Sequence, residues 1–570
     1  MKPEPAPSLP QHAPDPAARR RALAVAQTRY TYARREDNPL APIAVAGEFP
    51  LSELYGPRWA LPYLPHLLRS VADAQAKKLL YRLRAAVGGV DKLDGFRDLF
   101  SPRLGLHAPP SVTEHQRDGL FARNRIDGPN PLLLARVRDL DDLRRRLPLG
   151  DAELAQVLGD GATLAAEHAA GNLFVADFEL LARSLAPGAL VGRDSRWRGK
   201  YLPAPVALFC QRPGRDPQCD LVPVAIRVDQ PGAAEPNPVY LRDGSPRWAL
   251  AKTYVEIAEF NLQAMSSHIY RHHYVAEPFA VSMRRQLAPS HPIHVLLRPH
   301  TQHTIAVNRA ALNLLQKPDG VFATLYAGEL PETRNIMVRS YERWSVREQE
   351  LEADLAARGV GDGPREYPWR DDARLWTPVL RRFAAAYVRT YYRDDAAVRD
   401  DAELQAFVAE LQADDGGRLR GLLPGARLDG LDVLVDLLAQ FLFIAGPGHA
   451  AVHFPQTDHF TYVPAFPGAA YRPPPREHEV VDAARIAATL PPFAVGADQF
   501  QNNQIACYRF DRFGDYSRFE LGHVAAARPV IARLVADLAA IEREIERRNH
   551  ARPRPYPYLL PRLVPNSINI

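Results

Sequence analysis

Histidines carry the first chemical signal in this chain. His449 and His453 stand four positions apart in the segment HAAVH. Consecutive residues of an α-helix are rotated by about 100°, so these two imidazoles differ by ~40° and face the same way. A helix offers two nitrogen ligands to one metal ion in this manner. The pair therefore predicts one half of a metal site, although an isolated pair of this kind also occurs as ordinary packing.

A second segment, MSSHIYRHH at 265–273, offers two further pairings. His268 with His272 repeats the four-residue spacing. His268 with His273 would leave the rings ~140° apart in a regular helix, and only a π-bulge would bring them to one side. Helical geometry favours His272, and the spacing leaves both pairings open. Neutral imidazoles suit iron, copper, zinc or nickel alike.

These histidines need rigid elements to position them. Apolar residues at three- and four-residue spacing predict helices over 249–274, 383–392, 401–412, 431–445 and 524–548. Segment 201–209, with its prolines and β-branched residues, predicts an extended stretch. Gly446-Pro447-Gly448 should interrupt the preceding helix, and proline favours the first turn of a new one, which would open at His449. A simple loop between helices is the alternative.

Composition limits the fold and the partners. The 570 residues are 46% hydrophobic and 24% charged, and the net charge of +5 does not demand nucleic acid. Three cysteines without a C-x-x-C pair exclude a disulfide scaffold and a thiolate zinc site. We expect a disordered Pro/Ala-rich tail over 1–25 and a single, mainly helical domain with minor β elements over 26–570. No signal peptide or transmembrane span is evident, so a cytoplasmic monomer is expected.

Several further motifs occur in a fixed order around the histidines. They are DGPNP at 127–131, KYLPAP at 200–205, WALAK at 248–252, AEPF at 276–279, HPI at 291–293, LRPH at 297–300, YYRD at 391–394, DAELQ at 401–405, HAAVHFPQ at 449–456 and PNSINI at 565–570. Together they resemble the lipoxygenase family. The likeness spans about residues 118–570 and implies the family's large helical catalytic domain. The N-terminal region looks helical, so the chain resembles the shorter bacterial members, which lack the N-terminal β-barrel.

The resemblance implies a ligand set for one non-haem iron ion, with manganese as a possible substitute. The family's second ligand stands four residues before the Glu-Pro-Phe triplet, which selects His273 over His272 and implies a bulged helix. The other implied ligands are His268, His449, His453 and the α-carboxylate of Ile570. No catalytic side chain is implied beyond a metal-bound hydroxide.

The same resemblance implies a fatty-acid dioxygenase. Such an enzyme abstracts a hydrogen atom from a bis-allylic carbon of a polyunsaturated fatty acid, such as linoleate or arachidonate, and adds O₂. Ala at the position of Ala311 goes with S hydroperoxides in the family, and Gly goes with R. Gln456 matches a residue that links a metal ligand to the substrate cavity by hydrogen bonds. The positions that match the family's substrate pocket are Phe260, Ala311, Leu315 and Phe322.

Three alternatives compete with this reading. A hydroperoxide isomerase, or a catalytically altered lipid-binding member, would share the same fold. A zinc hydrolase would need a general-base glutamate beside its ligands, as in H-E-x-x-H, and neither histidine segment provides one. Contact with a membrane, if present, is expected to be peripheral and to use exposed apolar helices.

Overall fold

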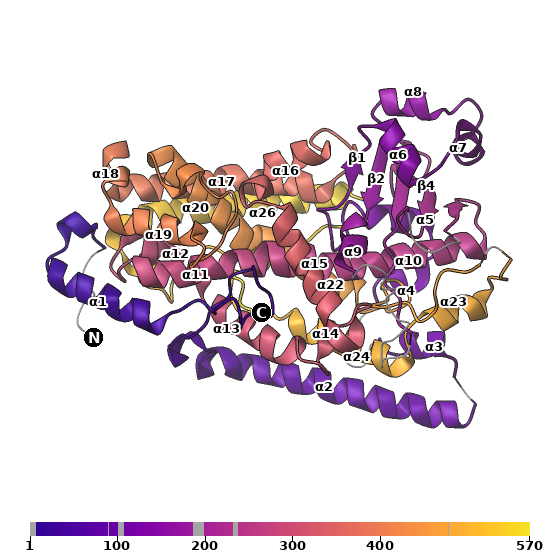
Figure 1. Ribbon diagram of the computed structural model, residues 1–570, viewed down its shortest axis with the longest axis horizontal. Helices are drawn as coiled ribbons and strands as arrows, with labels where there is room; N and C mark the ends of the chain where they lie inside the picture. The colour runs from indigo at the N-terminus through magenta and orange to yellow at the C-terminus, as the bar shows by residue number, and fades with distance from the viewer. Residues whose placement is uncertain (1–6, 89, 101–107, 186–198, 232–236, 477) are drawn as a thin grey trace.

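The computed structural model describes residues 7–88, 90–100, 108–185, 199–231, 237–476 and 478–570. The chain is mainly helical, with one small sheet at one end, as the sequence predicted (Figure 1). The first helices are α1 (Pro16–Arg29), α2 (Pro57–Ala86), α3 (Lys92–Arg97), α4 (Ser111–Glu114), α5 (Asp118–Arg123), α6 (Leu140–Arg146), α7 (Asp151–Leu158), α8 (Leu164–Ala169) and α9 (Glu179–Ser184).

The helices of the main body follow the sheet in sequence. They are α10 (Pro246–Leu262), α11 (Val275–Gln286), α12 (Pro292–Leu297), α13 (Thr304–Ala310), α14 (Val321–Leu325), α15 (Leu330–Arg343), α16 (Leu351–Arg358), α17 (Pro368–Tyr391), α18 (Asp395–Arg399), α19 (Ala402–Gln412), α20 (Leu431–Phe443), α21 (His449–His453), α22 (Pro455–His459), α23 (Ala483–Thr489), α24 (Phe493–Ala506), α25 (Glu520–His523) and α26 (Arg528–Ala551). Within the described ranges three segments are π-helical, namely η4 (Gln263–Tyr274), η6 (Ala311–Leu315) and η9 (Ile444–Gly448).

The sheet is an antiparallel meander in the order β1-β2-β3-β4-β5. Phe174 pairs with Phe209, and the register of β3 against β4 shifts after Leu208. The predicted extended stretch 201–209 is a strand only from Val206, while Tyr201 forms an isolated bridge with Ala470. The strands are β1 (Ala135–Arg136), β2 (Leu173–Asp177), β3 (Val206–Gln211), β4 (Leu221–Arg227) and β5 (Val239–Leu241).

Among the described residues, two large hydrophobic clusters and a small third one around Val281 and Ile305 form the interior. The largest one runs through the helical body, where α17 packs against α20 and α26. The second one joins one face of the sheet to α6, α7 and α8 through residues such as Leu143 and Leu208. The sheet with these helices therefore forms a lobe at one end of the molecule, visible at the upper right of Figure 1.

A helix begins within the range 1–25, for which composition predicted disorder. Residues 1–6 lie outside the described part of the chain, but α1 occupies Pro16–Arg29. Asp15 accepts a hydrogen bond from the Ala18 amide at 2.8 Å, and a proline follows this cap. Arg19 is 8% exposed and binds both carboxylate oxygens of Glu403 at 2.5 and 2.8 Å. The helix cap begins α1, and this ion pair connects α1 to α19.

The run Leu431–His459 is the most apolar helical stretch of the described residues. By length and composition alone it could cross a membrane, since it has 29 residues and a mean hydropathy of 1.6. However, 67% of its most apolar window is buried inside the fold. It also carries two of the histidines singled out above, which places polar nitrogen atoms in its centre. The run is therefore described here as a core element of the helical body.

Candidate metal centre

The π-helical segment η4 positions His268 and His273 on one side. Its wider turn removes the angular offset that a regular helix would impose at five-residue spacing. The nearest ring nitrogens of these two histidines, both Nε2, lie 3.1 Å apart. His272 points elsewhere and donates from Nδ1 to the Ser267 carbonyl at 2.7 Å. The predicted bulged helix is confirmed, and the four-residue pairing of His268 with His272 is wrong.

The second histidine segment follows another π-turn. Helix α20 widens into η9 at Ile444–Gly448, and α21 begins at His449. The helix therefore continues through a π-turn. The prediction that Gly446-Pro447-Gly448 interrupts the helix is wrong, and so is the alternative of a simple loop. Gly448 permits close packing here, because an added Cβ would lie 2.9 Å from the Phe443 carbonyl oxygen and 3.1 Å from His272 Nε2. Small residues at the turn thus let the two histidine-bearing segments approach each other.

Four buried histidines converge where these segments meet. His268 Nε2 lies 3.1 Å from His449 Nε2 and 2.9 Å from His453 Nδ1, and His273 Nε2 lies 3.2 Å from His449 Nε2. One ring nitrogen from each residue falls within 4.8 Å of all the others. Nitrogen ligands bind first-row metals at about 2.0–2.1 Å, so ligands at right angles stand about 3 Å apart. The observed separations match that spacing.

Hydrogen bonds between the four imidazoles cannot satisfy all of the ring nitrogens that face one another. A nitrogen of a neutral imidazole carries either a hydrogen or a lone pair, and never both. The Nε2 atoms of His268, His273 and His449 form a triangle, so at least two like nitrogens must face each other. A single cation that accepts the lone pairs of all three removes the conflict. The residues present therefore fit a transition-metal ion such as iron.

The electrostatic surroundings keep these imidazoles neutral. Burial lowers the pKa of His273 to about 4 and that of His453 to about 3. Burial also holds the pKa values of His268 and His449 well below the usual range, and the neighbouring histidines lower them further. Neutral rings keep the lone pairs that bind a metal.

A hydrogen-bond chain fixes the orientation of His273. Its Nδ1 donates to Asn308 Oδ1 at 2.9 Å, which leaves the lone pair on Nε2. The Asn308 amide donates in turn to Glu277 Oε2 at 2.8 Å, and Glu277 Oε1 accepts from the Ala46 amide at 2.9 Å. Sequence reasoning assigned no role to Asn308 or Glu277. A buried amide in the apolar helix α13 was the available signal for Asn308.

His453 and His268 are held from outside the cluster as well. His453 Nε2 donates to the Ala506 carbonyl at 2.7 Å, so Nδ1 turns its lone pair inward. The Gln456 side-chain nitrogen lies 3.1 Å from His268 Nδ1, at the edge of the cluster. A half-turn of this amide would present Oε1 to an Nδ1–H and free the Nε2 lone pair of His268.

The C-terminal residues are ordered inside the fold, near α13 (Figure 1). Thr304 Oγ1 donates to the Ile568 carbonyl at 3.1 Å, and Thr304 lies one turn before Asn308 on the same helix. His300 Nδ1 donates to the Asn566 carbonyl at 2.8 Å. Ile568 is buried and Ile570 is half-buried, and the carboxylate of Ile570 stays a predicted ligand.

The predicted pocket residues fall into two groups. Phe260 and Phe322 are buried and share Tyr326 as a neighbour, with ring centroids 5.0 and 5.1 Å from it. Ala311 and Leu315 are half-exposed in η6, which packs against the helix that carries Phe322. The structure thus brings the two phenylalanines together and places the other two residues on the adjoining segment.

A family model described as Lipoxygenase matches residues 214–489. The chain is similar to a linoleate 9/13-lipoxygenase of Pseudomonas aeruginosa, with 33% identity over 500 residues that cover 85% of this chain and 70% of that protein. It is also similar to a hydroperoxide isomerase, ALOXE3, of Homo sapiens, with 31% identity over 494 residues, 85% of this chain and 66% of that protein.

The fold is shared with solved structures. A lipoxygenase structure in complex with arachidonate superposes with a TM-score of 0.87 at 23% sequence identity. The superposition covers 99% of this chain and 84% of that one. Both the resemblance seen in the sequence and the predicted fold class are thereby confirmed.

Proposed function

Because the chain belongs to the lipoxygenase family, we propose that it is a non-haem iron dioxygenase that inserts O₂ into polyunsaturated fatty acids such as linoleate and arachidonate. The observation that carries this proposal is the convergence of four buried, neutral imidazoles at metal-ligand spacing. An iron ion bound there would supply the one-electron redox chemistry that removes a hydrogen atom from a bis-allylic carbon, after which O₂ adds to the carbon radical.

The chain's own residues hold and orient the ligands in this proposal. His268, His273 and His449 present Nε2, and His453 presents Nδ1. The α-carboxylate of Ile570 would complete the set and offset part of the metal's charge. The hydrogen bonds that anchor residues 566–569 support an ordered approach of the C-terminus. Burial of the cluster keeps bulk water away from a radical intermediate.

We assign the substrate chain to the apolar residues on the far side of the ligands. Phe260 and Phe322 would pack against the acyl chain, with Leu315 and Ala311 along the adjoining segment. The Ala311 methyl group would shield one end of the pentadienyl radical from O₂, so the product is expected to be mainly S.

The decisive experiment combines metal analysis with turnover. The purified chain should contain iron, consume O₂ with linoleate or arachidonate, and form a conjugated diene, and chiral chromatography should find mainly S hydroperoxide. If the protein contained manganese or zinc instead of iron, the proposed identity of the metal would be wrong. Absence of O₂ uptake by an iron-loaded protein would refute the dioxygenase.

A hydroperoxide isomerase is the second candidate. Its support is the similarity to a relative that carries this name. An isomerase would convert an added fatty-acid hydroperoxide without consuming O₂, and a lipid-binding member would do neither reaction. The same assay therefore separates the three outcomes.

Helix α2 suggests how substrate reaches the enzyme. It lies along one edge of the molecule (Figure 1), and its outward face carries leucines that are 45–65% exposed. They form two groups at three- to four-residue spacing, Leu61, Leu64 and Leu68 and then Leu79 and Leu83. The step of eleven residues from Leu68 to Leu79 is about three full helical turns, so both groups lie on one stripe. Exposed arginines, including Arg58 and Arg82, flank the stripe and complement anionic lipids.

We therefore propose peripheral binding of α2 to an anionic bilayer. The chain should sediment with vesicles of phosphatidylglycerol and phosphatidylcholine, and Leu64→Glu with Leu68→Glu should abolish sedimentation. Val535→Glu, at a 50% exposed position on α26, is the matched control and should still bind. Wild-type protein that stays in the supernatant would rule out this route of delivery.

A further inference from the structure

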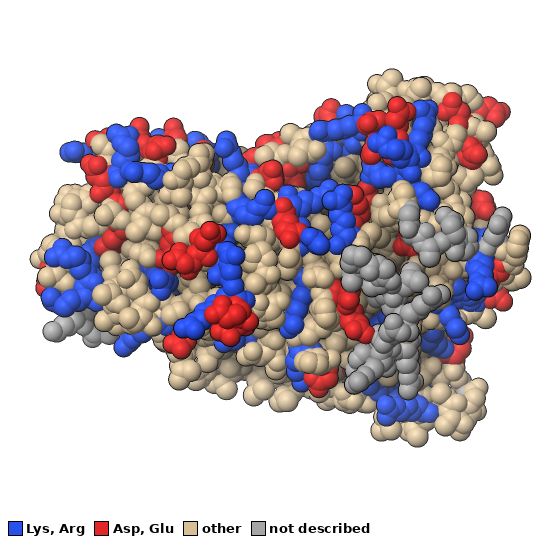
Figure 2. All heavy atoms as spheres, viewed as in Figure 1, with Lys and Arg blue, Asp and Glu red and all other residues tan. Residues whose placement is uncertain are grey.

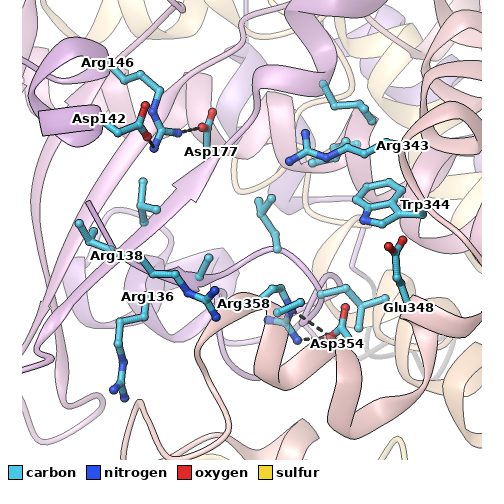
Figure 3. Close-up of a pocket in the computed structure, with 18 of the residues that line it drawn as sticks. Arg136, Arg138, Asp142, Arg146, Asp177, Arg343, Trp344, Glu348, Asp354 and Arg358 are labelled. Carbon is cyan, nitrogen blue, oxygen red and sulfur yellow. Dashed lines mark hydrogen bonds and ion pairs between the residues drawn. The ribbon is translucent and has the colours of Figure 1, made fainter. Parts of the chain in front are cut away.

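A cavity on the sheet side of η4 is separate from the histidine cluster. It has a volume of about 710 Å³ and lies where the sheet lobe meets α15 and α16 (Figure 3). Its apolar walls come from β2, α9 and the end of α10, through Val175, Leu180 and Leu262. The volume is in the range of sites for small organic ligands.

Arginines dominate the polar part of this lining. Arg146 is neutralised by Asp142 and Asp177, and Arg136 pairs with Asp362 at 2.8 Å. Arg138 donates to the Ala356 carbonyl and has no carboxylate partner among the described residues. In Figure 3 the Arg138 and Arg358 side chains point toward each other beside Asp354. Figure 2 shows basic side chains gathered over this part of the surface.

A buried charge imbalance lies at this end of the cavity. Arg271 donates to Asp354 Oδ1 at 3.2 Å, and Arg358 donates to Asp354 Oδ2 at 2.6 and 3.0 Å. Two guanidinium groups thus share one carboxylate, and the side chains of all three are at most 12% exposed. Uncompensated positive charge at such depth is costly, so the site favours an added anion. Arg138, an exposed residue that lines the same cavity, adds a third positive charge nearer the surface.

Arg271 is the most telling member of this group. It is 4% exposed, and its Nε has no hydrogen-bond partner among the described residues. Burial and the nearby positive charge of Arg358 hold the pKa of Arg271 below its usual range, although Asp354 raises it. Its guanidinium lies 5.2 Å from the ring centroid of Trp344, which also lines the cavity. A free donor on a buried cation is thus available beside an aromatic wall.

We propose that this cavity binds the carboxylate of a single-chain fatty acid, with the acid group at Arg271, Arg358 and Arg138 and the acyl chain along Leu180 and Leu262. The guanidinium groups can donate charge-assisted hydrogen bonds to a carboxylate, and such bonds are stronger than those between neutral groups. An inorganic anion would leave the apolar walls uncovered, whereas an acyl chain would cover them. Arg271 lies on the same helical segment as two of the cluster histidines, but its side chain is on another side, toward the cavity.

Trp344 provides a local probe for the test. A dibrominated stearate has no bis-allylic carbon, so it is not oxygenated, and its bromine atoms quench nearby indoles. Quenching seen in the wild type but missing in Trp344→Phe reports occupancy of this cavity alone. The chain has six tryptophans, so this subtraction is required. The methyl ester of the same acid tests the charge, and inorganic phosphate tests whether an anion without a tail competes.

The acid should quench Trp344 saturably, and its ester should bind at least about tenfold more weakly. Arg138→Glu should weaken the acid by a similar factor. Arg144→Glu, an exposed change on α6 outside the lining, should leave it unchanged. Equal quenching by acid and ester, displacement by inorganic phosphate alone, or no Trp344-dependent signal would each overturn the proposal. The ester arm uses unaltered protein, so a misfolded variant cannot obscure the result.

Discussion

Two faces of the segment η4 solve opposite electrostatic problems. One face buries His268 and His273 as neutral rings that turn lone pairs toward a common point. The other face buries Arg271 as a cation that shares a single carboxylate with Arg358. The side chains of His268, His273 and Arg271 are all buried, and they lie within a few residues of each other. The first face is suited to a cation and the second to an anion.

The comparison shows that burial alone does not decide what a site binds. Desolvation favours the neutral form of every ionisable group. Burial makes an imidazole neutral because its ordinary pKa lies close to neutral pH, whereas a guanidinium group stays protonated at any physiological pH even when it is buried. The ligand face is therefore electron-rich and nearly uncharged, and the arginine face keeps an excess of positive charge. Variants that affect one face and spare the other can test this division.

The largest effect should follow from His449→Ala. Removing one corner of the nitrogen triangle should strip the metal and lower O₂ uptake with linoleate by at least about 1,000-fold, since catalysis depends on the ion. His272→Ala is the matched control, because His272 is also buried in η4 but lies outside the cluster. Iron content and O₂ uptake are the measurements. Full iron content in the His449→Ala variant would contradict the assigned ligand set. Quenching of Trp344 by the brominated acid should be the same in this variant as in the wild type, because His449 lies outside the arginine cavity.

A smaller loss is expected from Asn308→Ala. His273 would lose the acceptor of its Nδ1–H bond and would no longer be held in one orientation. Groups that orient a metal ligand typically contribute 10- to 100-fold in metal affinity, and this range is the expected loss. Competition with a chelator measures the affinity. Asn313→Ala, an exposed amide on η6, is the control. If the Asn308→Ala variant bound iron as tightly as the wild type, the hydrogen bond from His273 to Asn308 would not contribute to metal binding.

Ala311→Gly should leave the metal in place and change the product. With the methyl group absent, O₂ should reach the other end of the radical, so the S to R ratio should fall by about tenfold, equivalent to ~1.4 kcal/mol. Ala310→Gly carries the same cost in helix propensity one residue away and should keep the S product. Chiral chromatography of linoleate and arachidonate products gives the answer. Identical product profiles for both variants would exclude Ala311 as the determinant.

The sequence predicted some of these features from spacing alone. The His449 and His453 pair needs only the pitch of a helix. The partnership of His268 with His273 needed the family resemblance, because regular helical geometry favours His272. The Pro/Ala composition of the tail gave no sign of α1, which begins after the cap at Asp15. Asn308 could not be linked to His273 without the fold that brings α13 against η4.

The arginine cavity could not be predicted from the sequence either, because the residues that form it are far apart in the chain. Its charged residues come from α6, η4, α15 and α16 and from the strand segment near Arg138, and no local pattern joins them. Most of the arginines that line the cavity have an aspartate or glutamate close to them in the sequence or in space. A count of charged residues along the sequence therefore gives no sign of a local excess of positive charge. Only the shared carboxylate of Asp354 and the unpartnered Nε of Arg271 reveal the imbalance.

The smallest catalytic effect, and the sharpest separation of the two faces, is expected from Ala357→Trp. Ala357 is an exposed residue of α16 at the rim of the arginine cavity, so an indole there should fill the space without disturbing the core. Turnover of linoleate should change by less than about twofold, because no ligand and no residue near Phe260 moves. Trp344 quenching by the brominated acid should be lost. A large fall in turnover with normal iron content would show that the two faces of η4 are coupled, and the division drawn above would then have to be abandoned.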